Sequence, residues 1–154
     1  MLIDKSFFID LDLSGYDACK AQFLRYGSKN MQFSDFIQSI EEFSELGDFL
    51  STPISTYSEG MKTRLMFALI TSFSHPLLAM DEGIATGDRF FIDKAIKRFE
   101  KFLESSSTLI IASHDENLLR RFTKRGLVLQ KGTCIFDGKL GEALKFYSNV
   151  RGQK

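Results

Sequence analysis

Two short apolar stretches, Leu77-Leu78-Ala79-Met80 and Leu109-Ile110-Ile111-Ala112, determine the fold that the sequence predicts. Each stretch is too short for a helix and is followed directly by polar residues, a pattern typical of a buried parallel strand. Between them, apolar residues recur at helical spacing from Phe91 to Phe102. A strand, an amphipathic helix and a second strand form a βαβ unit, whose crossover is almost always right-handed. The sequence therefore predicts an α/β fold with a parallel sheet flanked by helices.

The segments around this unit have their own patterns. Residues 1–56 are expected to be mostly helical, and apolar residues at helical spacing predict one helix over residues 36–43, with Ser34 as its N-cap and Gly47 at its end. A further helix is expected over residues 61–73. Later elements are predicted as a hairpin with strands at 127–130 and 133–136, and a helix over 141–147.

Composition limits the functions that the chain can have. Its 154 residues suit one domain, and its 20 basic residues balance its 20 acidic ones, so the charge pattern of a nucleic-acid-binding protein is missing. No stretch of ~18 apolar residues could span a membrane, and the first residues do not resemble a secretory signal. The two cysteines, Cys19 and Cys134, are expected to be free thiols. These features predict a cytoplasmic chain.

Two adjacent carboxylates, Asp81 and Glu82, follow the first predicted strand directly. In open α/β sheets, ligands bind at the carboxyl ends of the strands. Phosphoryl transfer needs a group that holds magnesium near the phosphates and a group that orients or deprotonates the attacking water. Asp81 is therefore a candidate magnesium ligand, acting through a bound water, and Glu82 a candidate general base. The structural alternative is a strand that ends in a polar turn with both acids in solvent.

A histidine, His114, follows the second predicted strand after Ser113. Parallel strands end at the same edge of a sheet, so His114 is expected near the carboxylate pair, where it could bind the γ-phosphate. The alternative is a surface or capping histidine. The other histidine, His75, precedes Pro76 at a strand entrance and is interpreted as structural.

A glycine turn, Tyr57-Ser58-Glu59-Gly60-Met61, precedes the helix expected over residues 61–73. A helix N-terminus offers unpaired N–H groups and a positive dipole end to an anion, and a glycine there lets the backbone approach a phosphate closely. The alternative is ordinary capping, either by a capping box from Thr56 to Glu59 or by Ser58 itself.

The order and spacing of these three motifs resemble the second half of an ATP-binding cassette (ABC) ATPase, with its signature, Walker B and switch-histidine motifs. Residues 83–88 fall where that family has its D-loop, with Asp88 in the final position; the alternative for Asp88 is the N-cap of the next helix. Within the family, the sequence resembles most closely the ATP-binding subunits of bacterial polysaccharide exporters for O-antigen, capsule or teichoic acid. That resemblance rests on residues 42–49, 57–68 and 80–88.

The resemblance implies a fold, ligands and partners. The fold would be the C-terminal part of a P-loop NTPase domain of the ABC type, with a partial helical subdomain at residues 1–56 and the C-terminal half of the ATPase core at residues 57–154. ATP and Mg²⁺ would be the ligands. Partners would be a second nucleotide-binding subunit and a membrane permease, at the inner face of the cell membrane. The nucleotide-binding residues would be Ser58, Glu59, Gly60 and Asp88, beside Asp81 for the metal and Glu82 and His114 for catalysis.

One family motif, the phosphate-binding loop Gly-x-x-x-x-Gly-Lys-Ser/Thr, is not found in the sequence. Gly138-Lys139 is followed by leucine, and Lys62-Thr63 is preceded by methionine. Loss of a single preorganised donor can cost ~3–4 kcal/mol of transition-state stabilisation. Without the whole loop, we expect this chain alone to lose ATP binding and, although the family is one of ATPases, to be inactive as an enzyme on its own. The resemblance places the loop upstream of Met1, which predicts an N-terminally incomplete domain with an unpaired strand edge.

Three interpretations follow. The chain is the C-terminal part of an exporter ATPase, or a non-catalytic half-domain that acts through its signature on a partner subunit, or an unrelated α/β module.

Overall fold

The computed structural model describes residues 2–3, 10–81, 89–104 and 108–151, and the side chains of all of these except residues 2, 3, 89 and 90. The helices and strands follow in the order β1 (Leu2–Ile3), α1 (Gly15–Tyr26), α2 (Phe33–Ser44), the 3₁₀ turns η1 (Gly47–Ser51) and η2 (Ile54–Thr56), α3 (Glu59–Ile70), β2 (Leu77–Asp81), α4 (Arg89–Glu104), β3 (Thr108–Ala112), α5 (Glu116–Phe122), β4 (Arg125–Gln130), β5 (Thr133–Lys139) and α6 (Leu140–Arg151).

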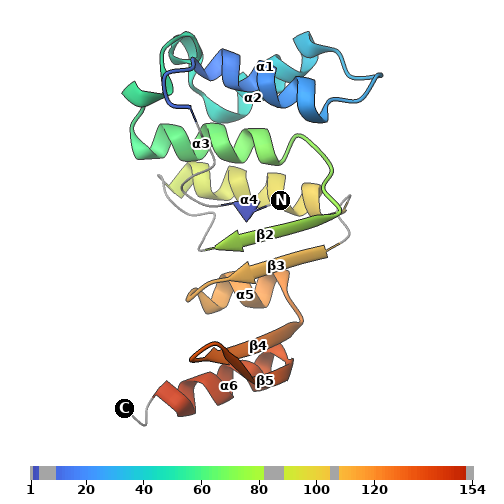
Figure 1. Ribbon diagram of the computed structural model, residues 1–154, viewed down its shortest axis with the longest axis vertical. Coiled ribbons are helices and arrows are strands. Elements are labelled where there is room, and N and C mark those ends of the chain that lie inside the picture. The colour runs from blue at the N-terminus through green and yellow to red at the C-terminus, as the bar shows by residue number, and fades with distance from the viewer. Residues whose placement is uncertain (1, 4–9, 82–88, 105–107, 152–154) are drawn as a thin grey trace.

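The predicted βαβ unit is confirmed (Figure 1). β2 and β3 pair in parallel, with Leu78 opposite Leu109 and Asp81 opposite Ala112. The short strand β1, which the sequence did not predict, pairs in parallel with the other side of β2. Alternate residues of β2 are buried, and they share one apolar core with the inward face of α4, as the period-2 and helical patterns require.

Helices α1, α2 and α3 form a separate layer above the sheet in Figure 1. The helix predicted over residues 36–43 is confirmed, but both of its predicted ends are wrong. Helix α2 starts at Phe33, so Ser34 lies inside it, and Gln32 stands at the N-cap without a side-chain hydrogen bond. The helix ends before Gly47 because Glu45 takes the left-handed conformation, with a φ of 57°.

Aromatic side chains fill the core between these layers. The Phe36 and Phe73 rings lie 5.2 Å apart, Phe43 and Phe67 5.8 Å, and Phe67 and Phe99 6.0 Å. Pairs at such distances add to the stabilisation that burial of the rings already provides. A continuous aromatic contact therefore joins α2 through α3 to α4.

The C-terminal part is a hairpin covered by a helix, as the sequence predicts. β4 and β5 are antiparallel, and both turn residues, Lys131 and Gly132, have positive φ, as a type I′ turn requires. Helix α6 packs on β4 closely enough that a Cβ added at Gly126 would lie 2.6 Å from the Cβ of Ala143. Helix α5 was not predicted.

Among the described residues, no helix combines the length and the apolar character that a membrane span needs.

Candidate functional site

The carboxylate of Asp81 stands at the carboxyl end of β2 and is exposed. Its Cα lies opposite that of Ala112, the last residue of β3, so the two strands end at the same edge of the sheet. Glu82, the candidate general base, lies outside the described residues, as do the D-loop residues 83–87 and Asp88.

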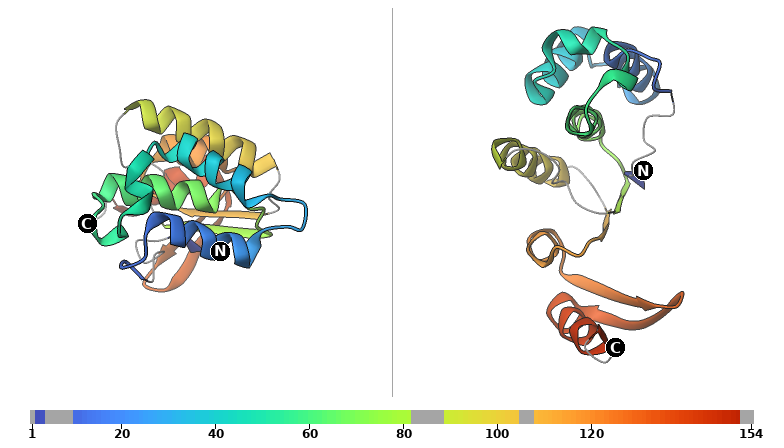
Figure 2. Two further views of the ribbon diagram at one scale, coloured as in Figure 1. Left: turned by 90° about the horizontal axis from the view of Figure 1, so that it is seen from above. Right: turned by 90° about the vertical axis from the view of Figure 1, so that its left-hand side faces the viewer.

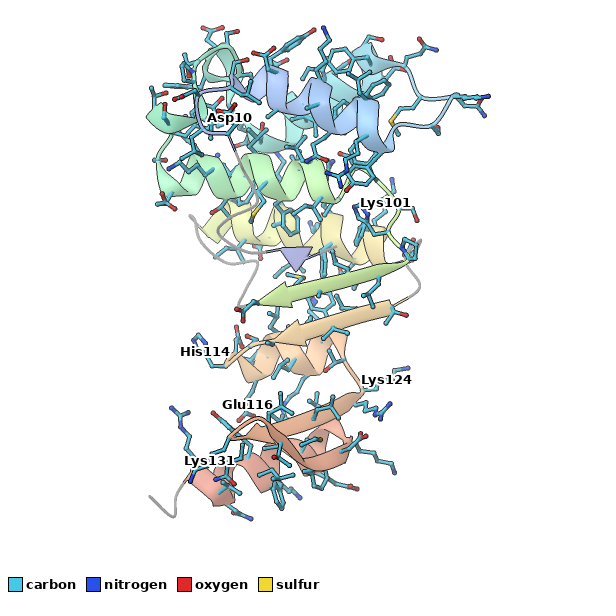
Figure 3. All side chains as sticks on the ribbon, in the orientation of Figure 1. Asp10, Lys101, His114, Glu116, Lys124 and Lys131 are labelled. Atoms are coloured by element: carbon cyan, nitrogen blue, oxygen red, sulfur yellow. The ribbon has the colours of Figure 1, made fainter. Side chains whose placement is uncertain are left out.

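His114 is exposed and lies two residues beyond the end of β3 (Figure 3). The turn that carries it is held by hydrogen bonds on both sides. Ser113 Oγ accepts from the backbone N–H of Asp115 at 3.0 Å, and Asp115 caps α5 by accepting from the N–H groups of Asn117 and Leu118 at 2.8 and 3.2 Å. The structure thus places His114 and Asp81 at one sheet edge, while their chemical roles stay predictions.

The signature turn forms the N-terminus of α3. Ser58 is the N-cap, and its Oγ accepts from the backbone N–H of Met61 at 3.2 Å. Glu59 pairs with Lys62 at 3.1 Å, and its side chain is 85% exposed. Thr56 takes no part in the cap, because its hydroxyl donates to the carbonyl of Pro53 at 2.7 Å. Capping by Ser58 is therefore the structural role that the turn fulfils, and it leaves the turn on the surface.

Gly60 is not required by the fold. Among the described residues, a Cβ added there would meet only Ser58 Oγ, at 3.8 Å. Gly60 lies in a helix, and within a helix alanine is preferred to glycine by about 0.5–1 kcal/mol. Gly126 differs, because a Cβ added there would collide with Ala143. A glycine that the protein's own packing does not need is compatible with a ligand that approaches from outside.

Tyr57 is buried and is the signature residue to which the sequence assigned no structural role. Its hydroxyl donates to the backbone carbonyl of Phe49 at 2.5 Å, and burial raises the pKa of this phenol. An added Cβ at Gly15 would collide with the same hydroxyl. The sequence contains both residues, Tyr57 before the N-cap Ser58 and Gly15 after Ser14. Nothing in the sequence indicates that they meet, because the contact depends on tertiary structure.

In the described part of the chain, the signature turn and the sheet edge belong to different layers. The N-terminus of α3 lies in the helical layer. In Figure 1 it is on the left, as are the carboxyl ends of β2 and β3, but it stands above them. Two surface clefts of the described part lie elsewhere, one beside Arg98 and Lys101 and one between α5 and α6.

The donors at the sheet edge fit a magnesium ion that is also bound by phosphate. No group of three or more acidic, histidine or cysteine side chains gathers as a metal site among the described residues. Mg²⁺ commonly takes only one or two protein carboxylates and completes its shell with phosphate oxygens and water. One exposed carboxylate at Asp81 is sufficient for such a site.

Comparison with known proteins identifies relatives of the chain. No protein-family model matches it. It is 41% identical over 124 residues to the O-antigen export system ATP-binding protein RfbE of Yersinia enterocolitica, covering 80% of this chain and 52% of that protein. It is 32% identical over 136 residues to the teichoic acids export ATP-binding protein TagH of Lactococcus lactis, covering 88% of this chain and 29% of that protein. The chain thus spans about half the length, or less, of these relatives.

Solved structures share the fold. An ATP-binding subunit of an ABC transporter superposes with a TM-score of 0.72 at 19% identity, covering 96% of this chain and 61% of that one. A dimeric ATP-binding cassette bound to ADP and Pi superposes with a TM-score of 0.68 at 18% identity, covering 90% of this chain and 62% of that one. The α/β fold is therefore that of the C-terminal part of an ABC ATPase, and by sequence and fold the chain belongs to the family of ABC transporter ATP-binding proteins.

Proposed function

We propose that the chain contributes the hydrolytic edge and the signature of an ATP-binding subunit that drives export of a polysaccharide such as O-antigen, capsule or teichoic acid. The observation that carries this proposal is the position of Asp81 and His114 at the ends of adjacent parallel strands, with the β2 and β3 termini in register. The similarity to export proteins supports the class of cargo.

At the sheet edge, each side chain has one task in the proposed reaction. Asp81 would hold Mg²⁺ through a bound water, and Glu82 would take the proton from the water that attacks the γ-phosphorus. As the new P–O bond forms, the bond to the β-phosphate oxygen breaks and ADP leaves. His114 donates a hydrogen bond to a γ-phosphate oxygen and keeps the water in line. The metal, when bound, neutralises charge that develops on the phosphates.

The signature turn acts on a nucleotide held by a second subunit. Ser58 Oγ already accepts a hydrogen bond from Met61, so its hydroxyl hydrogen can be donated to a phosphate oxygen. The first N–H groups of α3, on Glu59 and Gly60, have no partner within the helix and point outward. Asp88 would add a contact across the same dimer interface.

This role implies the partners, location and organisation that the family resemblance predicts. A second nucleotide-binding subunit and a membrane permease would hold the chain at the inner face of the membrane. Within the chain, residues 1–56 would be the partial helical subdomain and residues 57–154 the C-terminal half of the ATPase core.

The test replaces Glu82 by Gln in a full-length protein made by joining the chain to the part of the Yersinia relative that lies outside the 124 matched residues. Glu82→Gln should lower turnover by about 10²-fold or more, because the general base is lost, and should leave ATP binding unchanged. Glu41→Gln, on the exposed side of α2, is the matched control and should leave both unchanged. Turnover that persists in Glu82→Gln would refute the assignment of the base.

The alternative function, a non-catalytic half-domain that acts only through its signature, is favoured by the exposure of Ser58 and Glu59 and by the room around Gly60. A mixed dimer of this chain with an intact subunit separates the two. If only the signature acts, Ser58→Ala in this chain lowers turnover at the partner's nucleotide, and Glu82→Gln in this chain does not.

A further inference from the structure

Helix α2 ends in a left-handed residue with a long side chain, Glu45, whose φ is 57° and ψ 33°. Helices that end in this way usually have glycine or asparagine at that point, because other side chains strain the backbone. Among the described residues, Lys131 is the only other non-glycine residue with a positive φ, and the turn of the β4–β5 hairpin accounts for it. The backbone at the end of α2 does not need a glutamate, which indicates a role for its side chain.

The carboxylate of Glu45 joins three helices. It accepts from Arg64 Nη1 of α3 at 3.3 Å and from Lys94 Nζ of α4 at 2.5 Å. Lys94 also donates to the backbone carbonyl of Glu42, in the last turn of α2, at 2.8 Å. The right-hand view of Figure 2 shows α3 end-on, with α4 beside it and the helices α1 and α2 above. One carboxylate at the end of α2 therefore reaches both α3 and α4.

Aromatic rings fix the two cations of this bridge. The Arg64 guanidinium lies 4.7 Å from the centroid of the Phe91 ring of α4, and Lys94 Nζ lies 5.5 Å from that of Phe43 in α2. The Phe43 and Phe91 rings are themselves 5.3 Å apart. Cations over aromatic faces are attracted by the ring electrons, so both side chains are held in place for the carboxylate.

The bridge lies close behind the signature turn. Arg64 follows the N-cap Ser58 by six residues in the same helix, which is about 9 Å along the helix axis. The segment 42–49 also holds the start of α3 through Phe49, whose carbonyl accepts from the Tyr57 hydroxyl. This segment carries part of the family resemblance, yet the proposed ATPase chemistry uses none of its residues. Its contacts with the signature helix give it a task.

We propose that Glu45 is a positioning residue for the signature. Through Arg64 and Lys94 its carboxylate holds α3 against α4, and so fixes Ser58 and Gly60 relative to the nucleotide of the second subunit. The inference rests on the proposed function, because the signature acts on ATP only in the assembled dimer. The Glu45 side chain is 55% exposed, and exposed ion pairs add little stability, so loss of the bridge should affect turnover more than folding.

The test uses mixed dimers of the full-length protein described for the Glu82→Gln experiment. One subunit carries Glu82→Gln, so turnover occurs at the nucleotide of the other subunit, which the signature of the first one contacts. Glu45→Gln in the Glu82→Gln subunit should lower turnover by about tenfold to 10²-fold, because small displacements of a positioning group have effects of that size. Glu45→Gln in the other subunit should leave turnover unchanged. A merely structural loss would lower turnover in both arrangements and would overturn the proposal.

Glu42→Gln is the matched control, because it removes the same charge from the same helix. The Glu42 carboxylate accepts from Gln38 within α2 at 2.8 Å and forms no ion pair with the described residues of α3 or α4. Glu42→Gln should leave turnover unchanged in either subunit. The urea midpoint of Glu45→Gln should lie within about 0.5 M of that of the unaltered protein, as expected for an exposed pair.

Ser58→Ala in the Glu82→Gln subunit distinguishes failure of this inference from failure of the proposed function. If Ser58→Ala lowers turnover and Glu45→Gln does not, the signature acts as proposed and the role of Glu45 is wrong. If neither lowers turnover, the proposed function of the signature fails, and the role of Glu45 fails with it. With Ser58→Ala already present, Glu45→Gln should add little, because both act through one turn; additive losses would contradict the proposal.

Amide hydrogen exchange of the 154-residue chain tests the same link without nucleotide. The amides of Met61 and Lys62 bond to Ser58, and in Glu45→Gln they should exchange about threefold faster or more, because the start of α3 opens more often. The amide of Ala18, which bonds to Ser14 at the start of α1, should be unchanged. Equal exchange at the start of α3 in both proteins would show that Glu45 does not position the signature.

Discussion

The hydroxyl of Tyr57 donates a hydrogen bond of 2.5 Å to the backbone carbonyl of Phe49 and fills the space that a side chain at Gly15 would need. This contact joins the start of α1, the 3₁₀ turn η1 and the signature turn. Because Tyr57 directly precedes Ser58, the contact fixes where α3 begins. Tyr57 is thus a positioning residue for the signature, and its own hydroxyl faces inward.

Tyr57→Phe should lower the free energy of unfolding by about 0.5–1.5 kcal/mol, because the hydrogen bond from the Tyr57 hydroxyl to the carbonyl of Phe49 is lost, while Thr52 still donates to that carbonyl. Tyr147→Phe is the matched control: its ring is 45% exposed, and the change should be close to neutral. Urea unfolding measures both. Equal effects of the two substitutions would show that the Tyr57 hydroxyl contributes nothing specific.

The collision at Gly15 adds a coupling test. Gly15→Ala should destabilise the wild-type chain, since the new Cβ meets the Tyr57 hydroxyl, and should destabilise Tyr57→Phe less, because that hydroxyl is gone. Contacting residues in such cycles couple by about 0.5–3 kcal/mol. Additive effects would contradict the close approach of the two residues.

Gly60→Ala tests whether this glycine serves the function of the protein and not its stability. No described side chain other than Ser58, whose Oγ is 3.8 Å away, lies near the added Cβ, so the free energy of unfolding should rise by about 0.5–1 kcal/mol. If the backbone of Gly60 approaches a phosphate of the partner's ATP, the same substitution should lower turnover of the assembled ATPase.

The matched control is Gly141→Ala. Gly141 is also the second residue of its helix, α6, and an added Cβ there meets nothing within 4 Å. It should bring the same gain in thermal stability with no change in turnover. A Gly60→Ala protein that is more stable and fully active would remove the functional reason for the glycine.

The sheet was predictable from sequence because its signals are local. The apolar runs of β2 and β3 and the helical spacing from Phe91 to Phe102 in α4 depend only on neighbouring residues. β1 could not be found in this way, since two residues carry no periodicity. The end of α2 was wrong because Glu45 already takes the left-handed conformation and ends the helix before Gly47, which has a positive φ as well.

The candidate site was predictable only in part. Strand ends share an edge in any parallel sheet, which places Asp81 and His114 together from sequence alone. The buried hydrogen bond of Tyr57 to Phe49 was not predictable, because it depends on how η1 folds back on the signature. Polar residues that act through tertiary contacts leave no pattern in the chain.

Arg98 joins α4 to the end of α3. Its guanidinium donates to Thr71 Oγ1 at 2.7 Å, to Ser72 Oγ at 2.9 Å and to the carbonyl of Ala68 at 3.3 Å, and it stacks over the Phe43 ring at 4.4 Å. Lysine keeps the charge but loses the planar fork, so Arg98→Lys should cost about 1–2 kcal/mol of unfolding free energy.

The control for Arg98 is Arg121→Lys. Arg121 is 49% exposed and pairs with Glu100 at 2.7 Å, and exposed pairs contribute about 0–1 kcal/mol, most of which lysine can keep. Chemical unfolding of both variants measures the loss of unfolding free energy that each substitution causes. An Arg98→Lys chain as stable as Arg121→Lys would show that helix α3 does not depend on this side chain.

His75 should make stability depend on pH. It is only 5% exposed, it lies between the rings of Tyr26 and Phe102, and its Nε2 has no hydrogen-bond partner among the described residues. Burial lowers its pKa below 6.5, so below pH 6.5 the unfolded chain binds more protons than the folded one. The free energy of unfolding should therefore decline as pH falls from 6.5 toward the folded-state pKa and level off beneath it. His75→Phe, which keeps an aromatic ring in the slot, should remove that decline; urea midpoints that fall equally in both proteins would show that His75 is not its source.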